Sequence, residues 1–112
     1  MKISHRVLEA DIMLVHLDGR LDALASPKVK AALQQLLAKE QPKIIIDLQK
    51  VPFIDSSGLT SLVSGLRLAR EKGGNIALSG VQLQARTVFH LTMLDRVFHM
   101  YPTYDQAKQS LK

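Results

Sequence analysis

The stretch KIIIDLQKVPFIDSSGLTSL, residues 43–62, joins a run of apolar residues to a helical repeat through the turn DSSG. The first part, residues 43–48, is short, β-branched and continuously apolar, which predicts an internal strand covered on both faces. From Ser57 onward, apolar residues recur at helical spacing, and the pair Gly73-Gly74 is typical of a helix end. The stretch therefore predicts a central strand that leads directly into an amphipathic helix.

Further strands and helices are predicted on both sides of this stretch. Strands are expected at residues 2–8, 12–17, 75–79 and 97–101, with the first two joined as a hairpin by a polar turn at 9–11. A helix is expected to begin at Ser26, as the cap, with Pro27 in its first turn, and to stop before Pro42. Weaker helical patterns cover residues 82–91 and 103–111, and the last begins with a capping box of Thr103 and Gln106.

The order β-β-α-β-α-β-α-β-α predicts an α/β fold with one mixed, mostly parallel sheet, in which only the first strand runs antiparallel. We expect one compact domain over residues 1–112. In the helix after the DSSG turn, the periodicity places one set of residues inward, namely Leu59, Leu62, Val63, Leu66 and Ala69. It places a second set outward, namely Thr60, Ser61, Ser64, Arg67 and Glu71.

Composition excludes several classes of function. No apolar run approaches the ~20 residues that span a bilayer, and the first residues do not form a signal peptide, so we expect no membrane span and a cytoplasmic location. With no cysteine, the chain has no disulfides, thiolate metal sites or cysteine nucleophiles. The net charge of +5 is spread over single basic residues among acids, and only three Phe and two Tyr could stack on bases. This pattern argues against direct binding of nucleic acid.

The two serines of the DSSG turn admit two interpretations. Ser57 can cap the helix by accepting a hydrogen bond from a backbone N–H, which stabilises a helix by about 1 kcal/mol, and Ser56 could share this role. Alternatively, one of them is a modifiable hydroxyl at a helix start after a parallel strand, where ligands often bind in α/β proteins. A phosphate there would add about two negative charges beside Asp55. These considerations do not choose between Ser56 and Ser57.

The sequence gives little support for an enzyme. Neither serine is flanked by the glycines of a nucleophile elbow, the phosphate-binding loop motif is missing, and His5, His16, His90 and His99 lie in separate elements. We therefore assign no catalytic residue, cofactor or metal site. Asp55 most simply complements the dipole of the helix that follows it. An alternative is that Asp55 is a metal-binding or phosphoacceptor aspartate, which would require more carboxylates nearby. The candidates are Asp18, Asp22 and Asp47.

Three segments together resemble the STAS domains, in particular the bacterial anti-sigma factor antagonists. They are GRLDALASPKVKAALQQLL (19–37), IIIDLQKVPFIDSSGLTSLVSGLRLAREKGGNIALSGV (44–81) and LTMLDRVFHMYPTYDQA (91–107). The resemblance implies a protein-binding module without catalytic activity. Its partner would be an anti-sigma factor that is also a serine protein kinase, and the unphosphorylated module would bind this partner and free a sigma factor. Phosphorylation would block the binding and a serine phosphatase would restore it.

The family motif also assigns residues. The second serine of DSSG is the phosphorylated one, which is Ser57 here. Asp55, Ser56, Gly58 and Leu59 surround it, and Asp22 matches a position near the partner-binding surface. Other STAS domains belong to lipid or anion transport complexes, often with a degraded serine motif, and similar switches regulate targets other than sigma factors. A constitutive transport subunit or a regulator of another target is therefore the alternative function.

Overall fold

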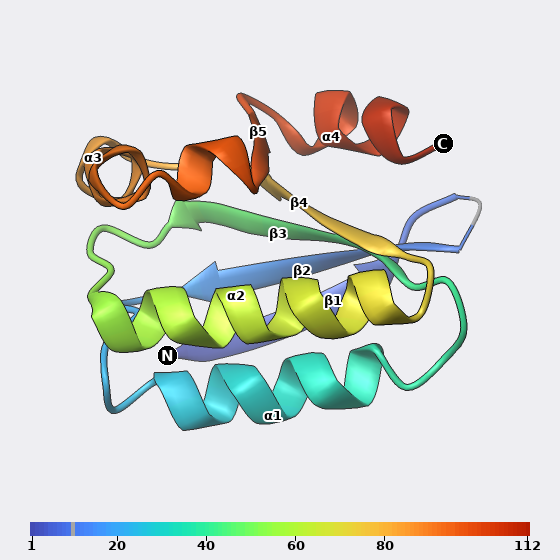
Figure 1. Cartoon of the computed structure of the whole chain (residues 1–112), viewed down its shortest axis with the longest axis horizontal. Coiled ribbons are helices and arrows are strands. Elements are labelled where there is room, and N and C mark those ends of the chain that lie inside the picture. Colours follow the sequence, from blue (N-terminus) through green and yellow to red (C-terminus); the bar gives the residue numbers. More distant parts are fainter. Residues whose placement is uncertain (10) are drawn as a thin grey trace.

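A computed structural model describes residues 1–9 and 11–112 and shows one five-stranded sheet with the strand order β1-β2-β3-β4-β5 (Figure 1). The strands are β1 Lys2–Val7, β2 Ile12–Asp18, β3 Lys43–Lys50, β4 Asn75–Ser79 and β5 His99–Tyr101. The helices are α1 Ser26–Leu36, α2 Ser56–Glu71, α3 Leu83–Leu91 and α4 Tyr104–Leu111, with a 3₁₀ turn at Leu94–Arg96. The predicted hairpin turn at 9–11 includes Ala10, which lies outside the described residues.

The topology confirms the predicted α/β fold. β1 pairs with β2 in the antiparallel direction, and the pairs β2 with β3, β3 with β4 and β4 with β5 are parallel. α1 and α2 cover one face of the sheet, and α4 packs on the other (Figure 1). As a result, Ile44, Ile45 and Ile46 of the central strand β3 are at most 1% exposed. The continuous apolar run predicted this two-sided burial, because successive side chains of a strand point to opposite faces.

The start of α1 differs from its prediction. Ser26 is not a cap but lies within the helix, and Ala25 occupies the cap position without a side-chain hydrogen bond. The Ser26 hydroxyl instead donates to the backbone oxygen of Asp22, with 2.7 Å between the two oxygens. The chain before Ser26 already turns helically, because the N–H of Ser26 also donates to Asp22 O. The serine hydroxyl therefore serves the preceding turn rather than the free N–H groups of the helix.

One side of α2 also differs from its prediction. The periodicity placed Ser61 outward, but it is only 4% exposed and donates from Oγ to the backbone oxygen of Gly58 at 2.7 Å. The reason is that α2 packs against α1 as well as the sheet, so a second side of the helix is covered. Small residues permit this close packing, since a Cβ on Gly65 would lie 2.9 Å from Leu33 Cδ1 of α1. The predicted end of α2 is confirmed, with Gly73 at a φ of 79° just after the cap residue Lys72.

Candidate functional site

The DSSG turn lies where β2 and β3 end, and it is tied to the chain that leaves β2. Leu21 and Ile54 form an isolated parallel bridge beyond the two strands. The N–H of Leu21 donates to Phe53 O at 2.9 Å, and the N–H of Asp55 donates to Leu21 O at 3.2 Å. Two loops that are far apart in sequence are therefore held together just before α1 and α2 begin.

Asp55 caps α2. Its backbone is extended, and its Oδ1 accepts from the backbone N–H of Gly58 at 2.9 Å. The prediction that Ser57 is the cap is wrong, because the helix begins at Ser56, one residue earlier than expected, and Ser57 lies inside the first turn. An aspartate in this position also complements the positive end of the helix dipole. The Asp55 carboxylate therefore has the capping role that one of the two interpretations of the turn gave to the Ser57 hydroxyl.

Gly58 and Leu59 are buried directly behind the serines. A Cβ on Gly58 would lie 2.3 Å from the backbone oxygen of Leu21 and 2.9 Å from Ile54 Cγ1, so only glycine allows the first turn of α2 to approach the two loops this closely. Leu59 is 6% exposed and belongs to the apolar core between the sheet and the helices. These two residues anchor the helix start rather than present side chains at the surface.

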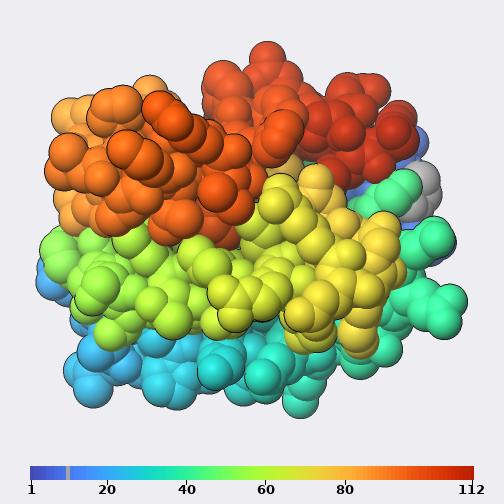
Figure 2. Space-filling view, viewed as in Figure 1, coloured from blue at the N-terminus to red at the C-terminus, as the bar shows by residue number. Residues whose placement is uncertain are grey.

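The serines face outward from this anchored turn. Ser56 is exposed, and Ser57 is half-buried. Ser57 lines a shallow depression between the starts of α1 and α2, which we call the helix-start hollow. It is lined by Ala23, Ser26, Pro27, Lys30, Ser57, Thr60, Ser61 and Ser64. The first turn of α2, green at the left of Figure 2, lies at the molecular surface between α1 and α3.

Asp22 orders the loop before α1. Its Oδ1 accepts from the N–H groups of Leu24 and Ala25 at 3.2 and 3.1 Å. Arg20 lies near it, with 3.7 Å between Arg20 Nε and Asp22 Oδ2, and the guanidinium carbon sits 4.1 Å from the ring centroid of Phe53. Leu24 is 91% exposed at the tip of the same loop. The loop thus presents a fixed carboxylate, a stacked cation and an apolar side chain.

The sequence did not reveal Gln84, which supports the DSSG turn from α3. Its Oε1 accepts from Ile54 N–H at 2.9 Å, and its Nε2 donates to Ile54 O at 3.0 Å. The side-chain amide thereby pairs with the backbone as a neighbouring strand would. Thirty positions separate the two residues, so no local pattern marks this contact.

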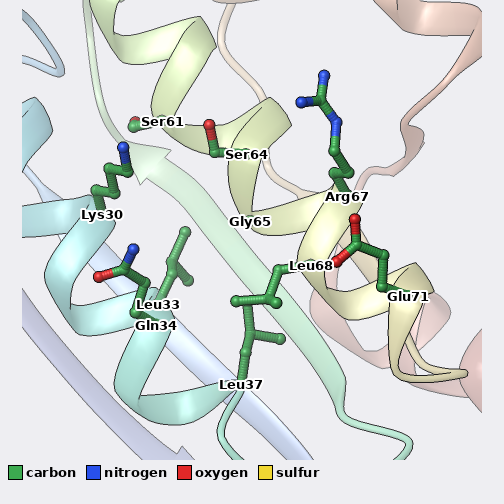
Figure 3. A pocket seen from close by; sticks show the side chains of 10 residues that line it. All are labelled: Lys30, Leu33, Gln34, Leu37, Ser61, Ser64, Gly65, Arg67, Leu68 and Glu71. Carbon is green, nitrogen blue, oxygen red and sulfur yellow. The ribbon is translucent and has the colours of Figure 1, made fainter.

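The helix-start hollow continues into a groove between α1 and α2 of about 230 Å³ (Figure 3). Lys30, Ser61 and Ser64 line both. Farther along, the groove is lined by Gln34 of α1 and by Arg67 and Glu71 of α2, over a floor formed by leucines and Gly65. Figure 3 shows the Lys30 side chain reaching from α1 toward α2 at the end of the groove nearest Ser61.

Of the aspartates weighed as metal ligands, Asp22, Asp47 and Asp55 accept hydrogen bonds from backbone N–H groups. Asp47, on β3, receives a hydrogen bond from Gln49 N–H at 3.0 Å and lies 3.0 Å from His16 Nδ1. Over residues 1–9 and 11–112 there is no group of three or more His, Cys, Asp or Glu side chains placed to hold a metal ion. Within the same residues, no helix is long and apolar enough to cross a membrane.

Comparisons with known proteins agree on one family. The family model described as the STAS domain matches residues 5–107. The anti-sigma-B factor antagonist of Listeria monocytogenes is 32% identical, over 89% of this chain and 90% of its own length. The anti-sigma F factor antagonist of Paenibacillus polymyxa is 29% identical, over 89% and 84% of the two chains. The crystal structure of an anti-sigma factor antagonist from Mycobacterium paratuberculosis has a TM-score of 0.84 at 28% identity, over 98% of this chain and 94% of that one.

Proposed function

We propose that this chain, which belongs to the STAS domain family, is an anti-sigma factor antagonist switched by phosphorylation of Ser57. In the unphosphorylated form it binds an anti-sigma factor that is also a serine protein kinase, so that a sigma factor is released in the cytoplasm. Phosphorylation of Ser57 ends this binding, and a serine phosphatase restores it. The names of the relatives support the general role.

The observation that carries the proposal is that Asp55, and not Ser57, caps α2. Asp55 caps α2, so the helix does not need the Ser57 hydroxyl as a cap. Ser57 is half-buried on the wall of an open hollow rather than enclosed in the core. A hydroxyl that is free of a capping role, fixed in place by its helix and reachable from solvent suits a phosphoacceptor.

The covalent step requires a partner that supplies ATP and a base. The Ser57 oxygen attacks the γ-phosphorus of ATP bound to the kinase, and the new O–P bond forms as the bond to the β-phosphate oxygen breaks. ADP leaves, and the hydroxyl proton passes to a base on the kinase. This chain contributes the acceptor and its position.

The added charge explains how binding would end. Phosphate adds about two negative charges to a surface that the partner must cover, and it stands beside Asp55 at the helix start. Leaving a mispaired charge in an interface costs about 2 to 5 kcal/mol, which is about 30-fold to several thousand-fold in affinity. This range is enough for an on/off response without any change of fold.

The remaining predicted site residues divide into two roles in this proposal. Ser56 is exposed next to Ser57, and Asp22 is half-buried in the loop before α1, so both can contact the partner directly. Gly58 and Leu59 are buried, so they act by holding the first turn of α2 in place, and Asp55 acts as its cap.

The test begins with the protein from its native cells, grown with and without stress. Mass spectrometry of the tryptic peptide 51–67 locates any phosphate among its hydroxyl residues, and we expect it on Ser57 in amounts that change with growth conditions. Binding to the anti-sigma factor of the same organism is then measured for wild type, Ser57→Ala and Ser57→Asp. The matched control is Ser110→Asp, which adds the same charge at an exposed serine of α4, on the other face of the sheet. We expect tight binding by Ser57→Ala and Ser110→Asp, and weak binding by Ser57→Asp.

Two results would contradict the proposal. One is a Ser57 that carries no phosphate under any condition, and the other is equal binding by wild type and Ser57→Asp. Co-purification with a transport ATPase regardless of the residue at position 57 would favour the constitutive transport subunit instead.

A further inference from the structure

The helix-start hollow contains one charged side chain besides the hydroxyls that line it. Among its lining residues, Ala23 and Pro27 are apolar, and four serines and Thr60 are neutral, so Lys30 carries the only charge. Lys30 is exposed at its place on α1, and its side chain reaches toward α2 (Figure 3). An ammonium group therefore shares one small depression with the Ser57 hydroxyl.

Neighbouring cations have other contacts. Lys28, two positions earlier on α1, donates from Nζ to the backbone oxygen of Met1 at 2.9 Å. Arg20 lies over the ring of Phe53 and beside Asp22, and it does not line the hollow. Among the described residues, Lys30 has no ion-pair partner within 4.0 Å. Of these three residues, Lys30 is the one available to an anion that enters the hollow.

A phosphate on Ser57 would need such a cation. Asp22 and Asp55 stand at the two helix starts that border the hollow, and both are acidic. Their charge is partly offset by the backbone N–H groups that donate to each carboxylate, yet both repel a dianion placed on Ser57. Lys30 supplies a positive charge on the same side as Ser57, and its flexible four-carbon stem can follow the phosphate.

We propose that Lys30 binds a phosphoryl group carried on Ser57 and holds it in the helix-start hollow. This inference rests on the proposed function, which supplies the phosphate. The hydroxyl of Ser64 lines the same hollow and can donate to one of the remaining phosphate oxygens. The phosphorylated protein then presents its new charge at a fixed place between the starts of α1 and α2.

The experiment uses full-length protein with phosphoserine incorporated at position 57 during translation, so it requires neither kinase nor partner. The second ionisation of the phosphate, with a pKa near 6 for a free group, is followed by ³¹P NMR as pH is varied. A cation beside the phosphate favours the dianion and lowers this pKa. Exposed ion pairs contribute about 0.2 to 1 kcal/mol, so we expect Lys30→Gln to reduce the ionisation constant about 1.5-fold to fivefold.

Two further variants separate a specific contact from a change of net charge. Lys28→Gln removes one positive charge from the same helix at a position that contacts Met1, and we expect the pKa of wild type. Lys30→Arg keeps the charge and is expected to restore the lower pKa. An unchanged pKa in Lys30→Gln, or equal changes in Lys30→Gln and Lys28→Gln, would overturn the inference.

The outcome is independent of the test of the proposed function. If the native kinase never modifies Ser57, the proposed function fails, while the titration still reports whether Lys30 binds a phosphate placed there. If Ser57 is a condition-dependent phosphosite but Lys30→Gln titrates as wild type does, the switch stands and the assignment of Lys30 fails.

Discussion

α1 and α2 lie side by side and begin at the same end of the sheet, yet their starts are built differently (Figure 1). α2 begins with a side-chain cap from Asp55, and its third residue, Gly58, presses on the backbone of Leu21. α1 begins at a cap position, Ala25, that makes no side-chain hydrogen bond. Its loop is ordered instead by Asp22, three residues earlier.

The two helix starts differ in the role of the serine hydroxyl in each. At α1, the Ser26 hydroxyl is committed to the backbone oxygen of Asp22. At α2, an aspartate provides the cap and a glycine provides the close approach, so Ser57 has no necessary role in the helix. The comparison separates a serine that belongs to the local structure from one that is available for chemistry, and substitutions in the two starts can test it.

The largest effect is expected from Gly58→Ala. The new methyl group would lie 2.3 Å from the backbone oxygen of Leu21, and backbone cannot move aside as the end of a side chain can. We expect a loss of about 3 kcal/mol in the free energy of unfolding, at the upper end of the range for overpacked sites. Urea denaturation followed by circular dichroism measures it.

Gly65→Ala is the matched control in the same helix. Its methyl group would meet Leu33 Cδ1 at 2.9 Å, which is the end of a flexible side chain. Alanine also favours a helix by about 1 kcal/mol over glycine, so the net change should stay within about 1 kcal/mol. Equal losses in the two variants would show that the contact with Leu21 does not pin the start of α2.

The next largest effect is expected from Gln84→Ala, which removes the amide that pairs with the backbone of Ile54. Ile54 is 1% exposed, so its N–H and C=O would lose their partners in a buried place. We expect a loss of about 2 kcal/mol in thermal or urea unfolding. Gln82→Ala, which removes an exposed bond to the Gln49 backbone oxygen, should cost about 0.5 kcal/mol. If Gln84→Ala lowered the free energy of unfolding as little as Gln82→Ala does, the contact from α3 would not stabilise the site.

Asp55→Ala tests the cap directly. We expect a loss of about 1 kcal/mol in the free energy of unfolding, because the Gly58 N–H loses its acceptor. Ser57→Ala should change stability by less than about 0.5 kcal/mol, since no cap is removed. If the two losses were exchanged, Ser57 would be the cap after all, and the interpretation of its hydroxyl as available would fail.

The order of strands and helices could be predicted because apolar periodicity reports burial directly. The run at Ile44–Ile46 and the repeat that begins at Leu59 each specify one element and its covered faces. The same logic failed at Ser61, because the periodicity counts one covered face, whereas α2 is covered by the sheet and by α1. Burial by a neighbouring helix depends on how the elements pack, which one sequence does not display.

The position of the candidate site could be predicted from the sequence, but its contacts could not. Asp55, Ser56 and Ser57 are all cap-forming residues, and the choice among them depends on where Leu21 holds the backbone of Asp55. Gln84 and Lys30 are distant in sequence and carry no local signal of their contact with the site. The family resemblance selected Ser57, and the geometry adds that its hydroxyl is not needed as the helix cap.

The smallest effect is expected from Ser26→Ala, and it completes the comparison of the two starts. The variant loses one half-buried hydrogen bond to Asp22 O, which contributes about 0.5 to 1 kcal/mol, and gains about 0.5 kcal/mol of helix propensity. Its stability should therefore match that of Ser57→Ala within about 0.5 kcal/mol. Under the proposed function, the two serine variants should nevertheless differ in phosphorylation by the kinase partner, which Ser57→Ala abolishes and Ser26→Ala retains. Because neither variant perturbs the fold, a loss of phosphorylation in both would mean that the kinase recognises the pair of helix starts as one surface, and that availability of the hydroxyl alone does not select Ser57.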